Sequence, residues 1–272
     1  METTAPRIHT APARTILSVS GPEARALLQR VITADVETLE AGQCRPGGLL
    51  TPQGKLAADF LLFADGETVW LDVPGATAEN LAKRLSMFKL RAKAEIVIHT
   101  DLAALWSEKP FENSAPDPRL GGAVHRGIGA EAGEAVSLDA IEILHGIPAF
   151  GRDYGEAETF PTDVNLDVYG GIGWKKGCFI GQEVVSRMKR RGTIRKRSLS
   201  LSFSDDAPAS GTPVMAGTST IGEITSSHGP HAIALIRLDR LETASEPLQA
   251  GGQPCTARVP DNLRPDAPAA KV

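Results

Sequence analysis

Cys178 is the residue of this chain whose surroundings most clearly suggest chemistry. It lies in the segment KKGCFIGQEVVSRMKRRGTIRKR, residues 175–197, after two lysines and shortly before a helix that we expect over residues 181–190. Positive charge and the amides of a helix N-terminus favour the thiolate form, so an exposed Cys178 would be a reactive thiol. The same amides could hold an anionic group. The alternative, which local chemistry alone favours, is a small buried side chain beside Phe179 and Ile180.

The segment becomes strongly basic after the cysteine. Residues 187–197 contain seven Lys or Arg residues and no aromatic residue, so stacking of single-stranded bases is not indicated. Glu183 and Arg187 have the spacing of a favourable helical pair, and Gly192 is a natural helix stop. We favour a solvated helix end for this run, and a phosphate or polyglutamate contact is the alternative.

The bulk composition restricts the function classes. The chain has 272 residues and a net charge of −4, so any nucleic-acid contact would need a local basic patch. Its three cysteines, Cys44, Cys178 and Cys255, form no Cys-x-x-Cys pair, which argues against a structural zinc site or a self-sufficient iron–sulfur cage. No apolar run has the length of a signal peptide or a membrane span. We therefore expect a cytoplasmic protein in a reducing compartment, without membrane partners.

The elements that must position this segment are strands and helices in alternation. In order, we expect a strand at 14–19, a helix from Ser20, two strands within 47–63, a strand at 67–74, a helix at 76–93 and a strand at 94–100. A short strand at 122–126, a helix at 137–148 and a loop at 149–173 follow. In the helix at 76–93, Leu81, Leu85, Phe88 and Leu90 lie near the helical period and predict its apolar side. This pattern is typical of an α+β sandwich.

The C-terminal part of the chain changes to a strand pattern. Five short strands are expected, separated by Gly, Pro, Ser or Asp, at residues 197–203, 212–216, 218–227, 231–239 and 254–260. Such spacing indicates a small β-barrel or sandwich as a separate domain. The tail DNLRPDAPAAKV is expected to be frayed.

The motif KGCFIGQEVVSR closely resembles the Lys-Gly-Cys-Tyr/Phe-x-Gly-Gln-Glu signature of the YgfZ-type folate-binding family. That family includes the mitochondrial iron–sulfur assembly factors and is related to the glycine-cleavage T-protein. Other segments resemble it in the same order: GPEARALLQRVITADVETLEAG, LLTPQGKLAADF, FPTDVNLD, GEITSS and AIALIR. The resemblance covers nearly the whole chain, and its signature is long and specific.

The resemblance implies an α+β, three-domain T-protein-like arrangement, with two α+β domains around a central channel and a C-terminal β-barrel. The first domain would be discontinuous, formed by residues 1–46 and 115–196, and would carry the motif. The second domain would be residues 47–114 and the barrel residues 197–262, followed by the tail 263–272.

The resemblance also implies a site. Cys178 would be the functional thiol and a transient iron–sulfur ligand, with no stable metal, and tetrahydrofolate would be the cofactor. The residues expected at the cofactor are Lys176, Gly177, Gly181, Gln182, Glu183, Arg187, Asp59, Thr51 and Asn165. The implied partners are iron–sulfur carrier or client proteins such as A-type carriers and tRNA-thiolating enzymes.

Two departures from the T-protein pattern bear on this site. T-protein relatives commonly carry adjacent acids where this chain has Ala58-Asp59, and a glutamate where it has Leu144, with Glu142 displaced by two positions. Both departures argue against aminomethyl transfer, and the second removes a carboxylate acceptor for a pterin, which Glu183 could replace. In the simpler interpretation, Asp59 only ends a strand and Asn165 only shapes a turn.

Three functions therefore compete. The favoured one is a non-catalytic factor for maturation or repair of iron–sulfur enzymes that uses Cys178, since a single thiolate needs partner cysteines to hold a cluster. The second is a tetrahydrofolate-dependent aminomethyl or one-carbon transferase. The third is an RNA-binding module that uses residues 187–197, and the acidic total charge makes it the weakest.

Overall fold

The computed structural model describes residues 5–260 of the chain, so the tail expected to be frayed lies outside the described residues. The chain divides into two compact units, each built from two stretches. Of the described residues, the first unit comprises 5–137 and 169–186, and the second comprises 138–168 and 187–260. The three-domain boundaries expected from the resemblance stay a prediction.

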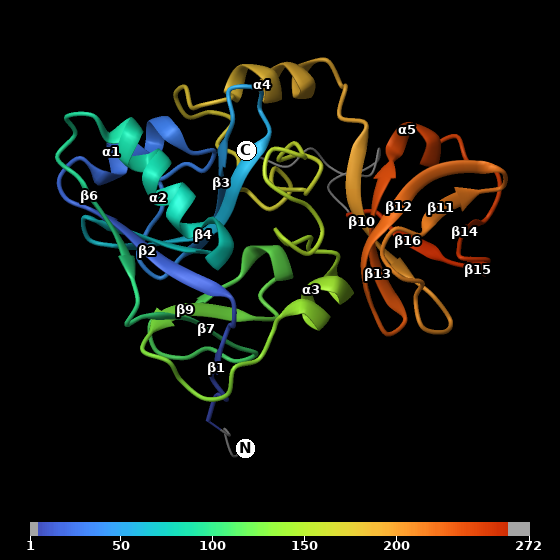
Figure 1. The fold of residues 1–272 in the computed structure, drawn as a ribbon, viewed down its shortest axis with the longest axis horizontal. Coiled ribbons are helices and arrows are strands. Elements are labelled where there is room, and N and C mark those ends of the chain that lie inside the picture. The colour runs from blue at the N-terminus through green and yellow to red at the C-terminus, as the bar shows by residue number, and fades with distance from the viewer. Residues whose placement is uncertain (1–4, 261–272) are drawn as a thin grey trace. The chain divides into compact units, whose positions relative to one another are not determined.

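The first unit is built on a five-stranded antiparallel sheet. Its strand order is β3 (Cys44–Leu50), β4 (Leu56–Asp65), β5 (Thr68–Pro74), β2 (Arg14–Ser20), β6 (Glu95–His99). Two helices pack on this sheet, α1 (Ala24–Val31) and α2 (Gly75–Lys89), as Figure 1 shows. The strands and helices expected in this part of the sequence are confirmed, apart from small differences at their ends.

The core of the first unit lies between that sheet and the two helices. Its buried side chains include Leu17 and Val19 of β2, Leu27 and Leu28 of α1, Leu62 of β4, Leu71 of β5, and Leu81 and Leu85 of α2. Side chains of this kind each contribute roughly 1.5–3 kcal/mol when they leave water. Ile180, from the second stretch of the unit, packs against the same core. The Cys178 segment is thus attached to the main hydrophobic core of its unit.

The apolar side of α2 is shorter than the sequence predicts. Leu81 and Leu85 are buried, but Phe88 is 38% exposed and Leu90 86% exposed. The helix ends at Lys89, and Leu90 takes a positive φ of 49°, which turns the chain out of the helical path. Phe88 and Leu90 were therefore wrongly expected to face the core.

A second, four-stranded sheet completes the first unit. Its order is β1 (His9–Thr10), β7 (Ala103–Ser107), β9 (His125–Gly129), β8 (Ala115–Pro116), and the short 3-10 helix η1 (Pro118–Leu120) lies near β8. The sequence analysis predicted a short strand near β9 but missed β7, whose five residues are all buried. A strand buried on both faces lacks the alternation that identifies a half-exposed strand.

An ionic cluster is buried in the first unit. Asp72 of β5 accepts hydrogen bonds from Arg14 at 2.6 Å and from Arg126 of β9, and Arg126 lies 3.9 Å from Asp117. Burial alone would raise the pKa of Asp117, but Arg119 and Arg126 hold that pKa below its ordinary value. Sequence periodicity missed this cluster. The available signal was a charged residue, Asp72 or Arg126, inside an otherwise apolar strand.

The second unit contains a seven-stranded sheet. Its order is β15 (Gln253–Pro254), β14 (Leu248–Ala250), β11 (Pro213–Ala216), β12 (Ser219–His228), β13 (His231–Arg237), β10 (Lys196–Ser202), β16 (Thr256–Arg258). These strands are the orange and red arrows of Figure 1, and their core includes Leu199, Leu201, Val214, Ile224 and Ile236. Four expected strands match β10 to β13. The fifth corresponds to β15 and β16, whereas β14 and the short helix α5 (Leu238–Leu241) were missed.

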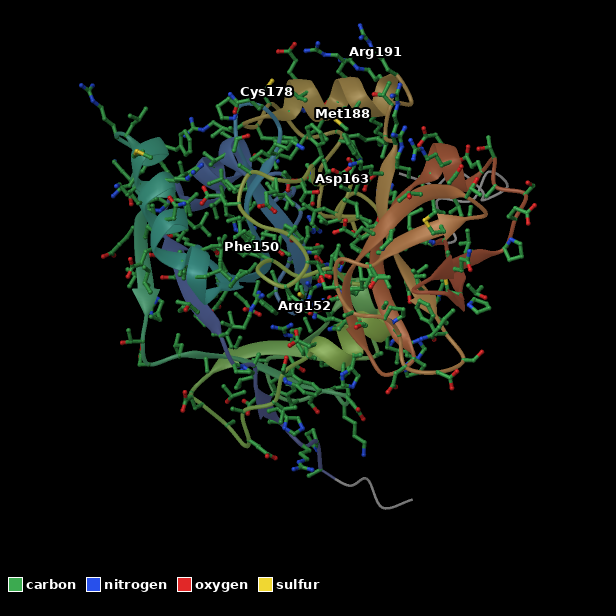
Figure 2. All side chains as sticks on the ribbon, turned by 45° about the vertical axis from the view of Figure 1, so that its right-hand side comes forward. Phe150, Arg152, Asp163, Cys178, Met188 and Arg191 are labelled. Atoms are coloured by element: carbon green, nitrogen blue, oxygen red, sulfur yellow. The ribbon has the colours of Figure 1, made fainter. Side chains whose placement is uncertain are left out.

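The helix α3 (Asp139–His145) is held in the second unit through Arg152. The Arg152 guanidinium bonds Asp139 at 2.7 Å, Glu142 at 3.1 Å and Asp153 at 2.8 Å, and donates to the carbonyl of Ile147. Figure 2 labels Arg152 in the loop that follows α3. Asp153 in turn accepts hydrogen bonds from two hydroxyl groups of β12, those of Thr225 and Ser226. The expected helix at 137–148 is confirmed over these seven residues.

Candidate functional site

Lys176 anchors the loop that carries Cys178. Its ammonium nitrogen donates to the carbonyl oxygens of Ile32 and Ala34 at 2.7 and 2.6 Å, and lies 5.2 Å from the centre of the Phe179 ring. Burial lowers the pKa of Lys176 to about 8, against the opposing attraction of Asp35 and Glu37. The amine therefore attaches the loop to the C-terminal end of α1 through two backbone carbonyl groups.

Gly181 fixes the motif against the turn between β3 and β4. It has a φ of +75°, and a Cβ there would lie 2.6 Å from the carbonyl oxygen of Thr51. A Cβ on Gly54 of that turn would lie 3.0 Å from the Cβ of Val184. Two sequence-distant segments thus meet at two glycines where larger residues would collide. This contact places Thr51 next to the motif.

Gln182 and Thr51 close the local turns on either side of this contact. The side-chain oxygen of Gln182 accepts from the backbone N–H of Phe179 at 3.3 Å, so it stabilises the turn that leads into α4 (Gln182–Arg190). The hydroxyl of Thr51 accepts from the N–H of Lys55 at 3.2 Å. Both polar side chains are engaged in shaping the backbone.

Cys178 itself is exposed. The neighbouring Phe179 is only 6% exposed and therefore lies in the interior. On the other side, Gly177 faces open space, since no atom outside its chain neighbours lies within 4 Å of the position that a Cβ would take. Figure 2 shows Cys178 in the loop just before α4. The buried alternative is therefore wrong, and the anchored residues around Cys178 hold an accessible thiol at a defined place on the surface.

The other two cysteines have different surroundings. Burial raises the pKa of the Cys44 thiol well above its ordinary value, and the nearby carboxylate of Asp117 adds to this effect. Burial also raises the pKa of Cys255 to about 11. Because the thiolate is the nucleophile and the metal ligand, both groups are poorly suited to such chemistry at neutral pH. Cys178 is the one exposed thiol of the three.

The remaining expected residues are placed as follows. Asp59 lies on β4, paired across the sheet with Gly48, and its charge acts on Arg14. Glu183 is exposed in the first turn of α4, in the first unit, whereas Arg187 is exposed and belongs to the second unit. Their roles at a cofactor stay predictions.

Asn165 lies in the second unit, where it has a positive φ of 61°. Its side-chain amide donates to the carbonyl of Ser198 at 2.6 Å, and Arg197 donates to the carbonyl of Thr162 and pairs with Asp167 at 2.5 Å. These contacts attach the loop to β10. They favour the simpler interpretation of Asn165, as a residue that shapes a turn.

Six of the seven cations in the basic run are exposed, and the seventh, Arg197, is buried. Arg197 is 3% exposed and paired with Asp167, so the last cation of the run is part of the interior of the second unit. Arg191 projects from the end of α4 in Figure 2 and is exposed. An RNA-binding surface at residues 187–197 would lack the contribution of Arg197.

Within residues 5–260 there is no group of three or more His, Cys, Asp or Glu side chains that could hold a metal ion. None of the helices in that part of the chain is long and apolar enough to cross a membrane.

The fold and the motif loop define a protein of the aminomethyltransferase T class of folds with an exposed cysteine. A solved structure of the glycine cleavage system aminomethyltransferase T from Bartonella henselae matches with a TM-score of 0.75 and 16% identity, over 93% of this chain and 84% of that chain. Residues 195–265 match the family described as CAF17, C-terminal beta-barrel domain. The expected α+β, T-protein-like fold with a C-terminal barrel is confirmed.

The chain belongs to the family of the IBA57 and YgfZ proteins. It is 31% identical to an iron–sulfur cluster assembly factor IBA57 homolog of Mycosarcoma maydis, over 86% of this chain and 66% of that protein. It is 25% identical to human IBA57, over 91% and 83%, and 28% identical to the tRNA-modifying protein YgfZ of Vibrio vulnificus, over 68% and 66%. The chain spans about half to two thirds of the length of the first two relatives from Mycosarcoma maydis and Neurospora crassa.

The expected cytoplasmic location is contradicted. The relatives from Mycosarcoma maydis, Neurospora crassa and Homo sapiens are all named as mitochondrial proteins, and these names contradict the expectation. The expectation rested on the lack of an apolar run of signal-peptide length, which does not exclude a mitochondrial location.

Proposed function

We propose that this protein acts in the assembly or maturation of iron–sulfur proteins, with Cys178 as its functional thiol. The observation that supports the proposal is the exposure of Cys178 on a loop whose neighbours are anchored by Lys176, Gly181 and Gln182. The names of the IBA57 relatives support the process.

The proposed chemistry is ligand exchange. The Cys178 thiol loses its proton, and the thiolate replaces one ligand on an iron of a cluster whose other ligands belong to a partner protein. One iron–ligand bond breaks and one iron–sulfur bond forms, the displaced ligand stays on the partner protein and takes up the proton that Cys178 loses, and no electron is transferred. An anchored loop suits this role because the thiolate must meet a cluster held in another molecule.

The test is rescue of a deletion strain. We expect Cys178→Ala to fold with an unchanged melting temperature and to leave iron–sulfur enzyme activity as low as in the empty-vector strain. Cys255→Ala is the matched control, because its thiol is partly buried with a raised pKa, and it should rescue fully. Full rescue by Cys178→Ala would remove the thiol from the proposal.

Tetrahydrofolate binding is a separate proposal that rests on the sequence resemblance. The residues do not fit a pterin site as they stand. The amine of Lys176, the side-chain oxygen of Gln182 and the amide of Asn165 are engaged with backbone groups, and Glu142 is paired with Arg152. Leu144 offers no acceptor.

Calorimetry with tetrahydrofolate on the wild type and on Glu183→Ala tests this second proposal. Tetrahydrofolate binding by the wild type that is lost in Glu183→Ala would support folate binding. The absence of any binding heat with the wild type would contradict it. Aminomethyl transfer stays the alternative prediction, and turnover of an aminomethyl donor by the purified protein would establish it.

A further inference from the structure

A groove in the first unit borders the Cys178 loop. It has a volume of about 840 Å³ and lies among the side chains of α1, the C-terminal end of α2 and Ile180. Ile180 is two residues beyond Cys178, so one wall of the groove belongs to the same anchored loop as the thiol. The groove and the thiol therefore belong to one compact part of the molecule.

The wall formed by the end of α2 is apolar and unusually exposed. Phe88 and Leu90 line the groove with exposed fractions of 38% and 86%, and Met87 beside them is 58% exposed. Leu90 also has a φ of 49°, in the region that normally requires glycine. A leucine that is both strained and exposed gains nothing for its own fold, which points to a function outside it.

The rim of this groove is positively charged. Arg30, Lys89 and Arg91 line it, and within residues 5–260 none of the three forms an ion pair with a carboxylate. Glu23 is the one acid among the lining residues, and its carboxylate accepts from the backbone N–H of Lys93 at 2.6 Å. An apolar groove with a basic rim is complementary to an acidic surface around an apolar side chain.

We propose that this groove is the docking surface for an iron–sulfur protein that presents an apolar side chain within an acidic patch. The proposal rests on the proposed function and adds the surface that brings the partner's cluster to Cys178. Phe88 and Leu90 bury the partner's apolar side chain, and Arg30, Lys89 and Arg91 pair with its carboxylates. The surface and the thiol then act in sequence, first in encounter and then in ligand exchange.

Two other occupants fit less well. A second copy of this chain, paired through the same groove, would bring the basic rims together and leave like charges facing each other. An anionic membrane would also attract the rim, but it does not account for the position of the groove beside an exposed thiol. The experiment below also tests for self-association and for membrane binding.

The experiment measures binding of an A-type iron–sulfur carrier from the same organism, with and without its cluster, by calorimetry. The test variant is the double substitution Leu90→Gly with Arg91→Glu. Because glycine accepts the positive φ, we expect no loss of melting temperature from the first substitution, and we expect the double variant to bind at least tenfold more weakly. Binding to the wild type should also weaken as salt is raised.

Matched controls separate this surface from general effects of charge or hydrophobicity. Lys83→Glu reverses an exposed charge on α2 that does not line the groove, and Leu144→Ser removes an exposed leucine of the second unit. Both should bind the carrier as the wild type does. Cys178→Ala should still bind the cluster-free carrier, since docking precedes ligand exchange.

The results discriminate between the two proposals. Wild-type affinity in the double variant, or no carrier binding by the wild-type protein, overturns the docking surface even if Cys178 is required for rescue. Rescue by Cys178→Ala overturns the thiol and leaves the binding measurements standing. Sedimentation experiments test for a dimer, and phosphatidylserine vesicles test for membrane binding. If the double variant loses either of these but binds the carrier as the wild type does, the inference is overturned in favour of the second copy or the membrane.

Discussion

At the scale of single residues, the exposure of Cys178 depends on neighbours that are turned inward. Local chemistry favoured a buried cysteine, because sequence alone does not show which of Cys178, Phe179 and Ile180 faces the core. In the structure Phe179 is buried and Ile180 packs on the core, which leaves Cys178 outside. The resemblance singled out Cys178 as the functional thiol, which stays a prediction, and the structure gives the physical reason for its exposure.

Lys176 gives a prediction at the same scale. Its pKa is about 8 in the folded protein and 10.5 as an ordinary lysine, so between these values the unfolded chain binds more protons. The free energy of unfolding should therefore rise from about pH 8 to about pH 10.5, and Lys176→Met should lack this rise. Partial exposure of Lys176 makes the gain smaller than for a fully buried lysine.

Urea unfolding at several pH values checks this expectation. Lys175→Met is the matched control, since Lys175 is the exposed neighbour in sequence and its replacement should leave the rise intact. The same dependence on pH in Lys176→Met and the wild type would show that Lys176 does not titrate in this range.

At the scale of elements, the site depends on a contact between two turns. The residues before α4 meet the turn between β3 and β4 at Gly181 and Gly54. Both glycines occur in the motifs that the resemblance identified, but their packing against each other was not predictable, because nothing in local periodicity pairs residues so distant in sequence. Sequence patterns predicted most elements and left their contacts undetermined.

Gly181→Ala tests this contact. The φ of +75° and the 2.6 Å approach of a Cβ to the Thr51 carbonyl both oppose alanine, so we expect a loss of about 2 kcal/mol or more in the free energy of unfolding. Gly177→Ala, in open space four residues earlier, should change it by less than about 0.5 kcal/mol. Equal effects of the two substitutions in urea unfolding would contradict the packing argument.

At the scale of the whole molecule, sequence and resemblance gave the α+β class and the C-terminal barrel. The missed features were those that long-range contacts create. The ionic cluster joins Asp72 of β5, Arg126 of β9 and Asp117, the N-cap residue of η1, and the basic groove forms where α1 meets the end of α2. Composition and residue spacing do not predict which charges distant in sequence come into contact, so these sites were not predictable from the sequence.

The two units each have a core of their own, which predicts separable opening. Ile224→Ala removes a fully buried side chain of the barrel and should destabilise the second unit by about 2–5 kcal/mol. We expect faster amide hydrogen exchange in β10 to β13, with unchanged protection in α1 and α2. Equal acceleration in both units would show that they open as one cooperative body.

The second stretch of the first unit is synthesised after residues 138–168, which belong to the second unit. Residues 169–186 supply Lys176, which holds the carbonyls at Ile32 and Ala34, and Ile180, which covers part of the core. A ribosome working at roughly 5–20 residues per second delivers them about 2–10 seconds after residue 137. During that interval the N-terminal sheet and helices have been synthesised, but the segment that covers part of their core has not. We therefore expect chaperones to bind and protect the nascent chain until residue 186 has emerged.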